Sequence, residues 1–255
     1  MSLAVSTIGV SNEGDGVMIR VTVWNEYIHE KEYEEIRRVY PDGIHGCIRE
    51  FLENEEDMAV RCATLDMPDC GLTEELLCET DVLIWWGHAA HEKVSDEAAL
   101  RVVSHVLRGM GFIALHSAHF CKPLKKLLGT GMTLKWKECD RERLFTVAPS
   151  HPIAEGIPES FTLEKEELYC EYFDIPKPDD IVFEGWFESG AVFRSGVTFT
   201  RGNGKIFYFQ PGHEEYPVYY DPVIRRILVN AVRWVRPVNR MEAERENVQV
   251  TSDFL

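Results

Sequence analysis

Three histidines follow short runs of apolar residues, at positions where an imidazole could move a proton or bind a metal ion. They are His88, His116 and His213, and the run before each is rich in aliphatic and aromatic residues. Such runs are typical of strands that are buried on both faces of a sheet. In an open parallel sheet, ligands bind beyond the carboxyl ends of the strands. We therefore expect the three imidazole groups to converge on one site.

His116 and His213 are the first candidates for proton transfer, together with the carboxylate of Glu167. Imidazole changes its charge near neutral pH, which suits general acid and base catalysis. Glu167 and its neighbour Glu166 would supply a carboxylate from a later strand. The alternative is that both glutamates are solvated charges on that strand, and the residues alone leave this open.

A metal site is the alternative to acid/base chemistry. The spacing His-x-x-His occurs in the pairs His88/His91 and His116/His119. A divalent metal such as zinc, bound by His88, His116 and His213, would fit the preference of zinc for imidazole. In metalloproteases the two histidines stand at i and i+4 on a helix, whereas both pairs here begin in a strand-to-loop turn. The spacing therefore does not fix where these rings point.

Other side chains at the strand ends are candidates for binding a substrate. The ring of Trp24 would suit stacking against a sugar, although core packing explains it equally well. Ser117 follows His116 in a turn placed like a nucleophile elbow, and Ser117 as a nucleophile remains an alternative. His29, in an acidic stretch, is equally compatible with a functional and a solvated position. The predicted substrate-binding residues are Trp24, Glu26, His45, His88, Ser117 and Tyr169.

Strands and helices alternate in the first half of the sequence. The patterns predict strands over 18–24, 58–64, 81–86 and 111–115. They predict helices over 45–52, 73–79, 95–108 and 123–128, with Thr73 and Ser95 as N-caps. This alternation is typical of right-handed βαβ units, so we expect an α/β fold with a parallel sheet and helices on both faces.

The second half of the sequence is rich in strands. These are expected over 133–148, 161–173, 181–188, 191–200 and 205–210, with a hairpin turn at 201–204 and a final helix over 221–235. The predicted organisation is a flexible segment over 1–17 and a single α/β domain over 18–236. That domain contains a β-rich insertion over about 130–200. A polar tail over 237–255 is either loose or packed against a partner subunit.

Acidic residues outnumber basic ones, 43 to 27, which gives a formal net charge of −16. This balance argues against nucleic acid and against an anionic membrane surface as partners. Eleven of the acids lie between residues 26 and 57, chiefly in an expected loop and on a helix face.

The seven cysteines form no C-x-x-C motif, which fits reduced thiols, and the first residues show no signal peptide. We therefore expect a cytoplasmic protein. The absence of a glycine-rich phosphate motif leaves NAD or ATP binding of that kind unsupported.

Seven motifs together resemble the ThuA-like trehalose-utilisation family, over about residues 18–235. They are VWNE at 23–26, LIWWGH at 83–88, ALHSAH at 114–119, LLGT at 127–130, HPIAEGIP at 151–158, EELY at 166–169 and GKIFYFQPGH at 204–213. The resemblance implies a fold similar to class I glutamine amidotransferases, with a flavodoxin-like sheet. It also implies a link to disaccharide or keto-sugar metabolism. The amidotransferase relatives have Cys at the elbow where this chain has His116, which argues against glutamine hydrolysis.

Two functions of different class follow from these residues. The first is an enzyme that acts on a disaccharide or keto-sugar by His-based acid/base or metal chemistry. The alternative is a non-catalytic subunit that binds a sugar or forms a complex, for example with a partner dehydrogenase. We also expect a homo-oligomer, because the β-rich region has more aromatic residues than one small core needs. These are Phe183, Trp186, Phe187, Phe193 and Phe199.

Overall fold

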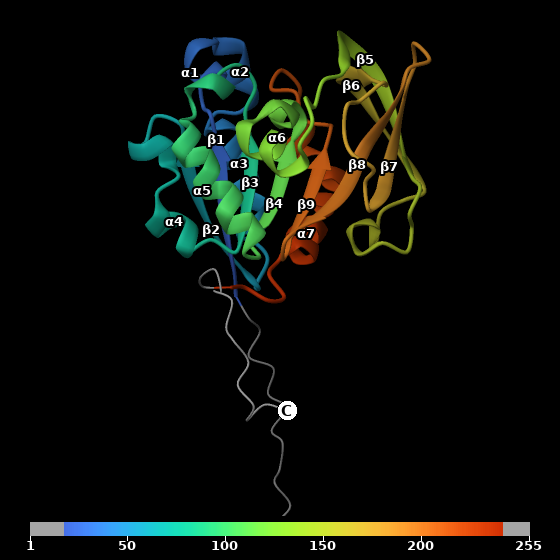
Figure 1. Cartoon of the computed structure of the whole chain (residues 1–255). Helices are drawn as coiled ribbons and strands as arrows, with labels where there is room; N and C mark the ends of the chain where they lie inside the picture. The colour runs from blue at the N-terminus through green and yellow to red at the C-terminus, as the bar shows by residue number, and fades with distance from the viewer. Residues whose placement is uncertain (1–17, 242–255) are drawn as a thin grey trace, which may run out of the picture.

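The computed structural model describes residues 18–241 and contains one nine-stranded sheet in the order β2-β1-β3-β4-β9-β8-β7-β5-β6. The flexible segment predicted over 1–17 lies outside the described residues, as does the predicted tail from residue 242 onward. The sheet changes character along its width, from parallel to antiparallel pairing (Figure 1).

The first part of the sheet is parallel, as the sequence predicts. Its strands are β2 (Met58–Thr64), β1 (Ile19–Asn25), β3 (Val82–Trp86), β4 (Gly111–Leu115) and β9 (Gly204–Phe209). Each pairs in parallel with its neighbour in that order. Every residue of β3 and β4 is buried, which confirms the interpretation of their continuous apolar runs. The carboxyl ends of these strands therefore meet at one edge.

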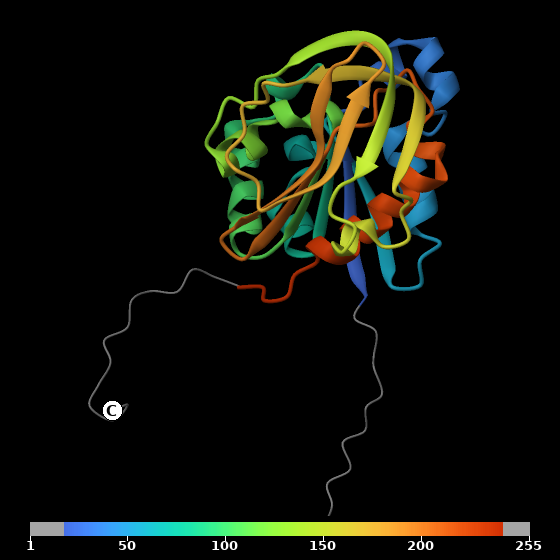
Figure 2. The same cartoon turned by 90° about the vertical axis from the view of Figure 1, so that its right-hand side faces the viewer.

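The second part of the sheet is antiparallel. It contains β8 (Val192–Arg201), β7 (Asp180–Phe187), β5 (Lys135–Thr146) and β6 (Ser160–Cys170). The hairpin predicted at 201–204 joins β8 to β9, with Arg201 opposite Gly204. Figure 2 shows these strands as a curved layer that continues the parallel sheet. Their pairing is therefore a direct extension of the α/β core.

Helices cover both faces of the parallel strands (Figure 1). On one face, α3 (Gly43–Leu52) and α7 (Pro222–Val235) pack in one buried apolar cluster. On the other, α4 (Glu74–Cys78), α5 (Asp96–Leu107) and α6 (Lys122–Leu128) pack in a second. Short 3₁₀ helices occupy turns: η1 (Pro68–Gly71), η2 (His91–Lys93), η3 (His116–Phe120), η4 (Pro152–Ala154) and η5 (Val218–Tyr220).

The predicted helix caps are confirmed. The hydroxyl of Thr73 accepts a hydrogen bond from the backbone of Leu76, and that of Ser95 accepts one from Ala98. Each bond satisfies one of the backbone N–H groups that a helix leaves free in its first turn. The α6 helix ends at Gly129, whose φ of +70° is the left-handed conformation common at helix ends.

The acidic stretch after β1 differs from the loop that the sequence predicts. It contains two short helices, α1 (His29–Glu32) and α2 (Glu34–Val39). Glu30 is buried and its carboxylate accepts hydrogen bonds from the side chain of Asn25 and the backbone of Ile44. Periodicity could not reveal these helices, because each is too short to show an apolar stripe.

The aromatic residues of the β-rich region are mostly internal. Phe183, Phe187, Phe193 and Phe199 are at most 2% exposed, whereas Trp186 is 42% exposed. The apolar content that suggested self-association is thus largely used by the molecule's own core, and self-association stays a prediction.

The predicted tail begins in contact with the core, because Arg240 donates hydrogen bonds to the carbonyls of Leu77 and Thr80. None of the helices within 18–241 has the length and apolar character that a membrane crossing requires.

Candidate functional site

His116 stands at a sharp turn where β4 ends and η3 begins. Its φ is +52°, in the left-handed region that costs an ordinary residue roughly 1–2 kcal/mol. Its Nδ1–H donates to the carbonyl of Gln210 over 2.8 Å, because a carbonyl oxygen can only accept. This bond joins the end of β4 to the segment after β9 and fixes the direction of the ring.

The other nitrogen of His116 faces the carboxylate of Glu167. The distance from Nε2 to Oε2 is 3.0 Å, and both residues are buried, His116 completely. Burial disfavours the imidazolium, but the hydrogen bond and charge of Glu167 outweigh it and raise the pKa of His116 to about 9. Burial likewise opposes the carboxylate, but His116 holds the pKa of Glu167 below its ordinary value. The two side chains therefore form a buried ion pair, and the interpretation of Glu167 as a solvated charge is wrong.

Tyr169 and Ser117 complete the surroundings of this pair. The Tyr169 ring stacks on that of His116, with centroids 4.9 Å apart and 14° between the planes. The Tyr169 hydroxyl lies 3.0 Å from Oγ of Ser117. Burial raises the pKa of Tyr169 well above its ordinary value, so the phenol stays protonated. Because Ser117 pairs with this phenol rather than with an imidazole, the geometry does not favour Ser117 as a nucleophile.

His213 reaches the same place from the segment after β9. Its Nδ1 accepts a hydrogen bond from the backbone N–H of Glu215 over 3.3 Å, which leaves the ring proton on Nε2. Burial lowers the pKa of His213 to about 4, so the ring is neutral at neutral pH. Its centroid lies 5.3 Å from that of His116 and 5.6 Å from that of His88. The three imidazole rings thus lie close together at this edge of the sheet, as the strand ends predict.

Glu166 holds the segment that positions His213. Its Oε2 accepts the backbone N–H of Gly212 over 2.9 Å, and its Oε1 accepts those of His213 and Glu167. Gly212 adopts a φ of +140°, and a Cβ at this position would come 2.0 Å from the hydroxyl oxygen of Tyr219. Only glycine fits this close approach. Glu166 is fully buried, so it too is not a solvated charge.

A pocket of about 450 Å³ opens beside these residues. Among the predicted site residues, Glu167, His213, His88, Ser117 and Tyr169 line it, while His116 lies behind Glu167. The other lining residues, which include His91 and His119 of the His-x-x-His pairs, come from the turns and from β5. They are His91, His119, Phe120, Thr133, Leu134, Trp136 and Glu138.

Three predicted substrate-binding residues lie elsewhere. Trp24 is buried against Trp85, with ring centroids 3.9 Å apart. Glu26 is buried and accepts hydrogen bonds from the backbone of Ala89 and Ala90, which shapes the turn after β3. His45 lies within α3, and its Nδ1 is 2.9 Å from the side-chain nitrogen of Asn25. None of the three lines the pocket.

Trp136 is one of two aromatic side chains at the pocket, with Phe120, that the sequence did not predict. It is 62% exposed on β5, whereas the tryptophans at the ends of β1 and β3 are buried. The sequence marks β5 only as a strand-like segment. Which side chain of an antiparallel strand reaches the histidines depends on its register, and no local signal predicts that.

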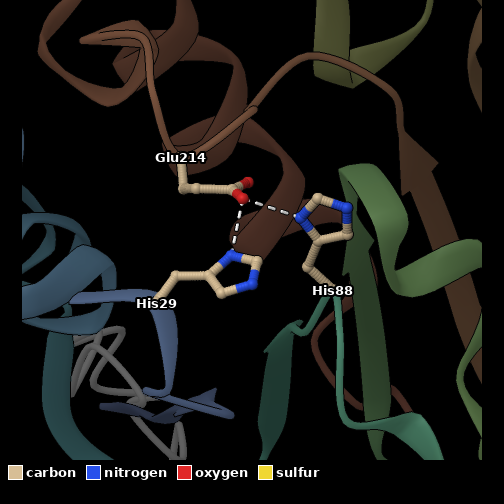
Figure 3. Close-up of side chains that lie close together, drawn as sticks. All are labelled: His29, His88 and Glu214. Atoms are coloured by element: carbon tan, nitrogen blue, oxygen red, sulfur yellow. Dashed lines mark hydrogen bonds and ion pairs between the residues drawn. The ribbon is translucent and has the colours of Figure 1, made fainter. Parts of the chain in front are cut away.

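Two of the three side-chain clusters within residues 18–241 that could hold a metal ion lie at this edge of the sheet. One contains His116, Glu167 and His213, and the other contains His29, His88 and Glu214. Figure 3 shows the second, in which both imidazoles point at one carboxylate. The three predicted metal ligands are therefore divided between two clusters. In the first, both ring nitrogens of His116 already have partners, at Gln210 and Glu167.

A family model and several solved structures match this chain. A family model described as trehalose utilisation (ThuA) matches residues 20–235. A putative ThuA-like protein from Bacteroides uniformis aligns with a TM-score of 0.62 and 16% identity, over 89% of this chain and 94% of that one. Another from Parabacteroides merdae aligns with a TM-score of 0.65 and 15% identity, over 88% and 93%. A cytoplasmic protein from Salmonella typhimurium has a TM-score of 0.59 and 14% identity, over 86% and 100%. None of the curated proteins compared with the chain matches it.

Proposed function

This chain belongs to the ThuA trehalose-utilisation family, and from that premise we propose that it is an enzyme of carbohydrate catabolism that acts on a disaccharide or keto-sugar. The substrate lies in the pocket at the carboxyl ends of the parallel strands. The observation that carries the proposal is the buried contact between His116 and Glu167, whose carboxylate lines that pocket.

Glu167 touches the substrate, and His116 acts from behind it. A single proton can pass between Nε2 of the ring and Oε2 of the carboxylate, which are 3.0 Å apart. The pair can therefore give a proton to a sugar oxygen, or take one from a carbon beside a keto group. A positioned acid or base of this kind contributes roughly 10²–10⁴-fold to a rate.

His213 supplies a hydrogen-bond donor on the same pocket wall. With Nδ1 accepting from the backbone of Glu215, its Nε2–H is available to a substrate oxygen. A donor that is fixed before the reaction stabilises negative charge that develops on such an oxygen. Glu167 thus transfers the proton, and His213 stabilises the negative charge on the substrate oxygen.

The pocket suits a sugar in size and lining. Its volume falls in the range of about 300–1,000 Å³ that is common for small-molecule sites. Trp136 and Phe120 offer aromatic faces on which the C–H face of a sugar ring packs. The hydroxyls of Ser117 and Tyr169 and the carboxylate of Glu138 lie at its wall to bind sugar hydroxyls.

The finer assignments of fold, location and assembly belong to the same proposal. The parallel order β2-β1-β3-β4-β9 and the left-handed His116 support a flavodoxin-like sheet with an elbow like that of glutamine amidotransferases. The names of two similar Salmonella proteins support a cytoplasmic location. The exposed Trp186 and Val192 on the antiparallel strands support a homo-oligomer.

The proposal is tested by incubating the full chain with trehalose, related disaccharides and their 3-keto derivatives, and following the products by chromatography. We expect turnover of at least one keto-sugar and a fall in kcat of roughly 10²–10⁴-fold for Glu167→Gln. Glu164→Gln is the matched control, because Glu164 is an exposed residue of the same strand. A Glu167→Gln variant with unchanged kcat would overturn the assignment of Glu167.

The same experiment separates the enzyme from a binding subunit. Sugar binding without turnover, seen as a change in tryptophan fluorescence, would favour a non-catalytic subunit that delivers a sugar to a partner such as a dehydrogenase. Neither binding nor turnover with an intact fold would remove the carbohydrate assignment altogether.

A further inference from the structure

We propose that His29, His88 and Glu214 bind a divalent transition-metal ion of the zinc type, through one nitrogen of each imidazole and one carboxylate oxygen. The three residues come from different parts of the chain: His29 begins α1, His88 follows β3 and Glu214 follows β9. They meet at the carboxyl edge of the parallel strands (Figure 3). This site is distinct from the His116–Glu167 pair.

Nδ1 of His29 and Nδ1 of His88 approach the same carboxylate oxygen. Oε1 of Glu214 lies 2.6 Å from Nδ1 of His29 and 2.8 Å from Nδ1 of His88. The three donor atoms all lie within 4.8 Å of one another. Two imidazoles and one carboxylate are the protein ligands of many catalytic zinc sites, in which a water or a substrate completes the set. The chemistry of the donors therefore fits this class of metal ion.

Glu214 has an unsatisfied oxygen as well. The residue is 3% exposed, and its buried Oε2 has no hydrogen-bond partner within the described residues. An ionised carboxylate in such a place needs compensation for the loss of water. Nε2 of His213, whose ring is neutral, lies 3.7 Å from this oxygen, which is beyond a good hydrogen bond. A cation at the cluster would supply the missing interaction.

The negative charge around the cluster and its exposure to solvent also favour a bound cation. Glu26 and Glu30 are buried close to this edge and add negative potential at His29. The side chains of His29 and His88 are 15% and 30% exposed, so solvent reaches the cluster. The present N···O contacts are hydrogen bonds, and zinc would replace them by bonds of about 2.0–2.2 Å after rotation of the partly exposed rings. His88 also lines the sugar pocket, so the cluster adjoins that pocket.

The competing interpretation is that Glu214 only orients two imidazoles through their Nδ1–H groups. The two interpretations differ in a property that needs no substrate, which is stoichiometric metal binding. Absence of metal binding would therefore not affect the activity proposed for Glu167. Absence of that activity would likewise not affect the metal site.

The test uses the full chain after removal of any histidine tag and of metal by a chelator. Zinc is titrated by calorimetry and counted by elemental analysis, and cobalt is then substituted for its visible absorption. We expect one ion per chain, with affinity falling roughly 100-fold or more in His29→Ala and His88→Ala, since even changes behind the ligands cost about 10–100-fold. His91→Ala is the matched control, because His91 lines the same pocket without belonging to the cluster. Its affinity should change by less than about threefold.

Three results would overturn the site. They are no stoichiometric binding to a folded chain, unchanged affinity in both His29→Ala and His88→Ala, and loss of binding in Glu167→Gln with retention in His29→Ala. The last result would assign the ion to the cluster of His116, Glu167 and His213. His29 is partly exposed at the start of α1, so its variant should fold, and circular dichroism checks this.

Discussion

Oε2 of Glu166 accepts a 2.9 Å hydrogen bond from the backbone N–H of Gly212, and this contact joins the antiparallel part of the sheet to the segment after β9. Glu166 belongs to β6, at the far edge of the sheet, and Gly212 precedes the pocket residue His213. The two parts of the molecule therefore meet at the candidate site, and the pocket exists only when both are folded.

Replacing Glu166 should loosen this junction. Three backbone N–H groups donate hydrogen bonds to the Glu166 carboxylate. In Glu166→Gln, one of them would face the side-chain N–H₂ group instead. A buried donor left without an acceptor costs about 1–3 kcal/mol, so we expect a loss of that size in the free energy of unfolding. Urea denaturation measures it. Glu164→Gln, exposed on the same strand, should change stability by less than about 0.5 kcal/mol.

Gly212→Ala should destabilise the protein through a steric clash. The new Cβ would come 2.0 Å from the Tyr219 hydroxyl, at a φ of +140°. We expect a loss of about 3 kcal/mol or more, from strain and overpacking together. The control is Gly190→Ala, where φ is +93° and nothing lies within 4 Å of the new Cβ. Gly190→Ala should lower the free energy of unfolding by roughly 1–2 kcal/mol, which measures the backbone strain alone. Equal losses of stability in the two variants would contradict the steric clash.

Trp136→Ala should weaken sugar binding. Removing the aromatic face takes away apolar contact area without touching Glu167 or His213, so the Kd should rise roughly tenfold, about 1.4 kcal/mol. Isothermal titration with the best-bound sugar measures the change. Trp186→Ala removes an exposed tryptophan outside this pocket and should leave the Kd unchanged. A similar loss in both variants would point to a general effect on the fold.

Stability should fall in acid through the ion pair of Glu171 with Arg194. Burial opposes the Glu171 carboxylate, but two hydrogen bonds from Arg194, of 2.7 and 2.8 Å, hold its pKa below the ordinary value. A depressed pKa stabilises the fold above the unfolded value of about 4.3, and this contribution is lost as the pH falls through the folded value.

Glu171→Gln measures that contribution. Because the pair is partly exposed, we expect the variant to be less stable by about 1 kcal/mol at neutral pH. Below the folded pKa the difference should shrink toward zero. Urea denaturation of both proteins across the acid range tests this, and a difference that does not depend on pH would show that the pair's charge is irrelevant.

The sequence by itself determined the order of the strands along the chain and the edge at which chemistry could occur. The runs of β3 and β4 are apolar throughout because both of their faces are covered, and this pattern needs no knowledge of the partners. Ser95 and Thr73 marked helix starts because a cap bonds to the backbone within its own first turn. The histidines after β3, β4 and β9 converge because parallel strands bring their carboxyl ends to one edge.

Only the tertiary structure decided which side chains at that edge act together. Glu167, Trp136 and Glu214 join the histidines through strand pairing and through segments distant in sequence. Trp24, at the end of a strand like the histidines, turned inward to pack against Trp85. A shift of one residue in a strand reverses the face of every side chain, and that register is set by long-range pairing rather than by local sequence.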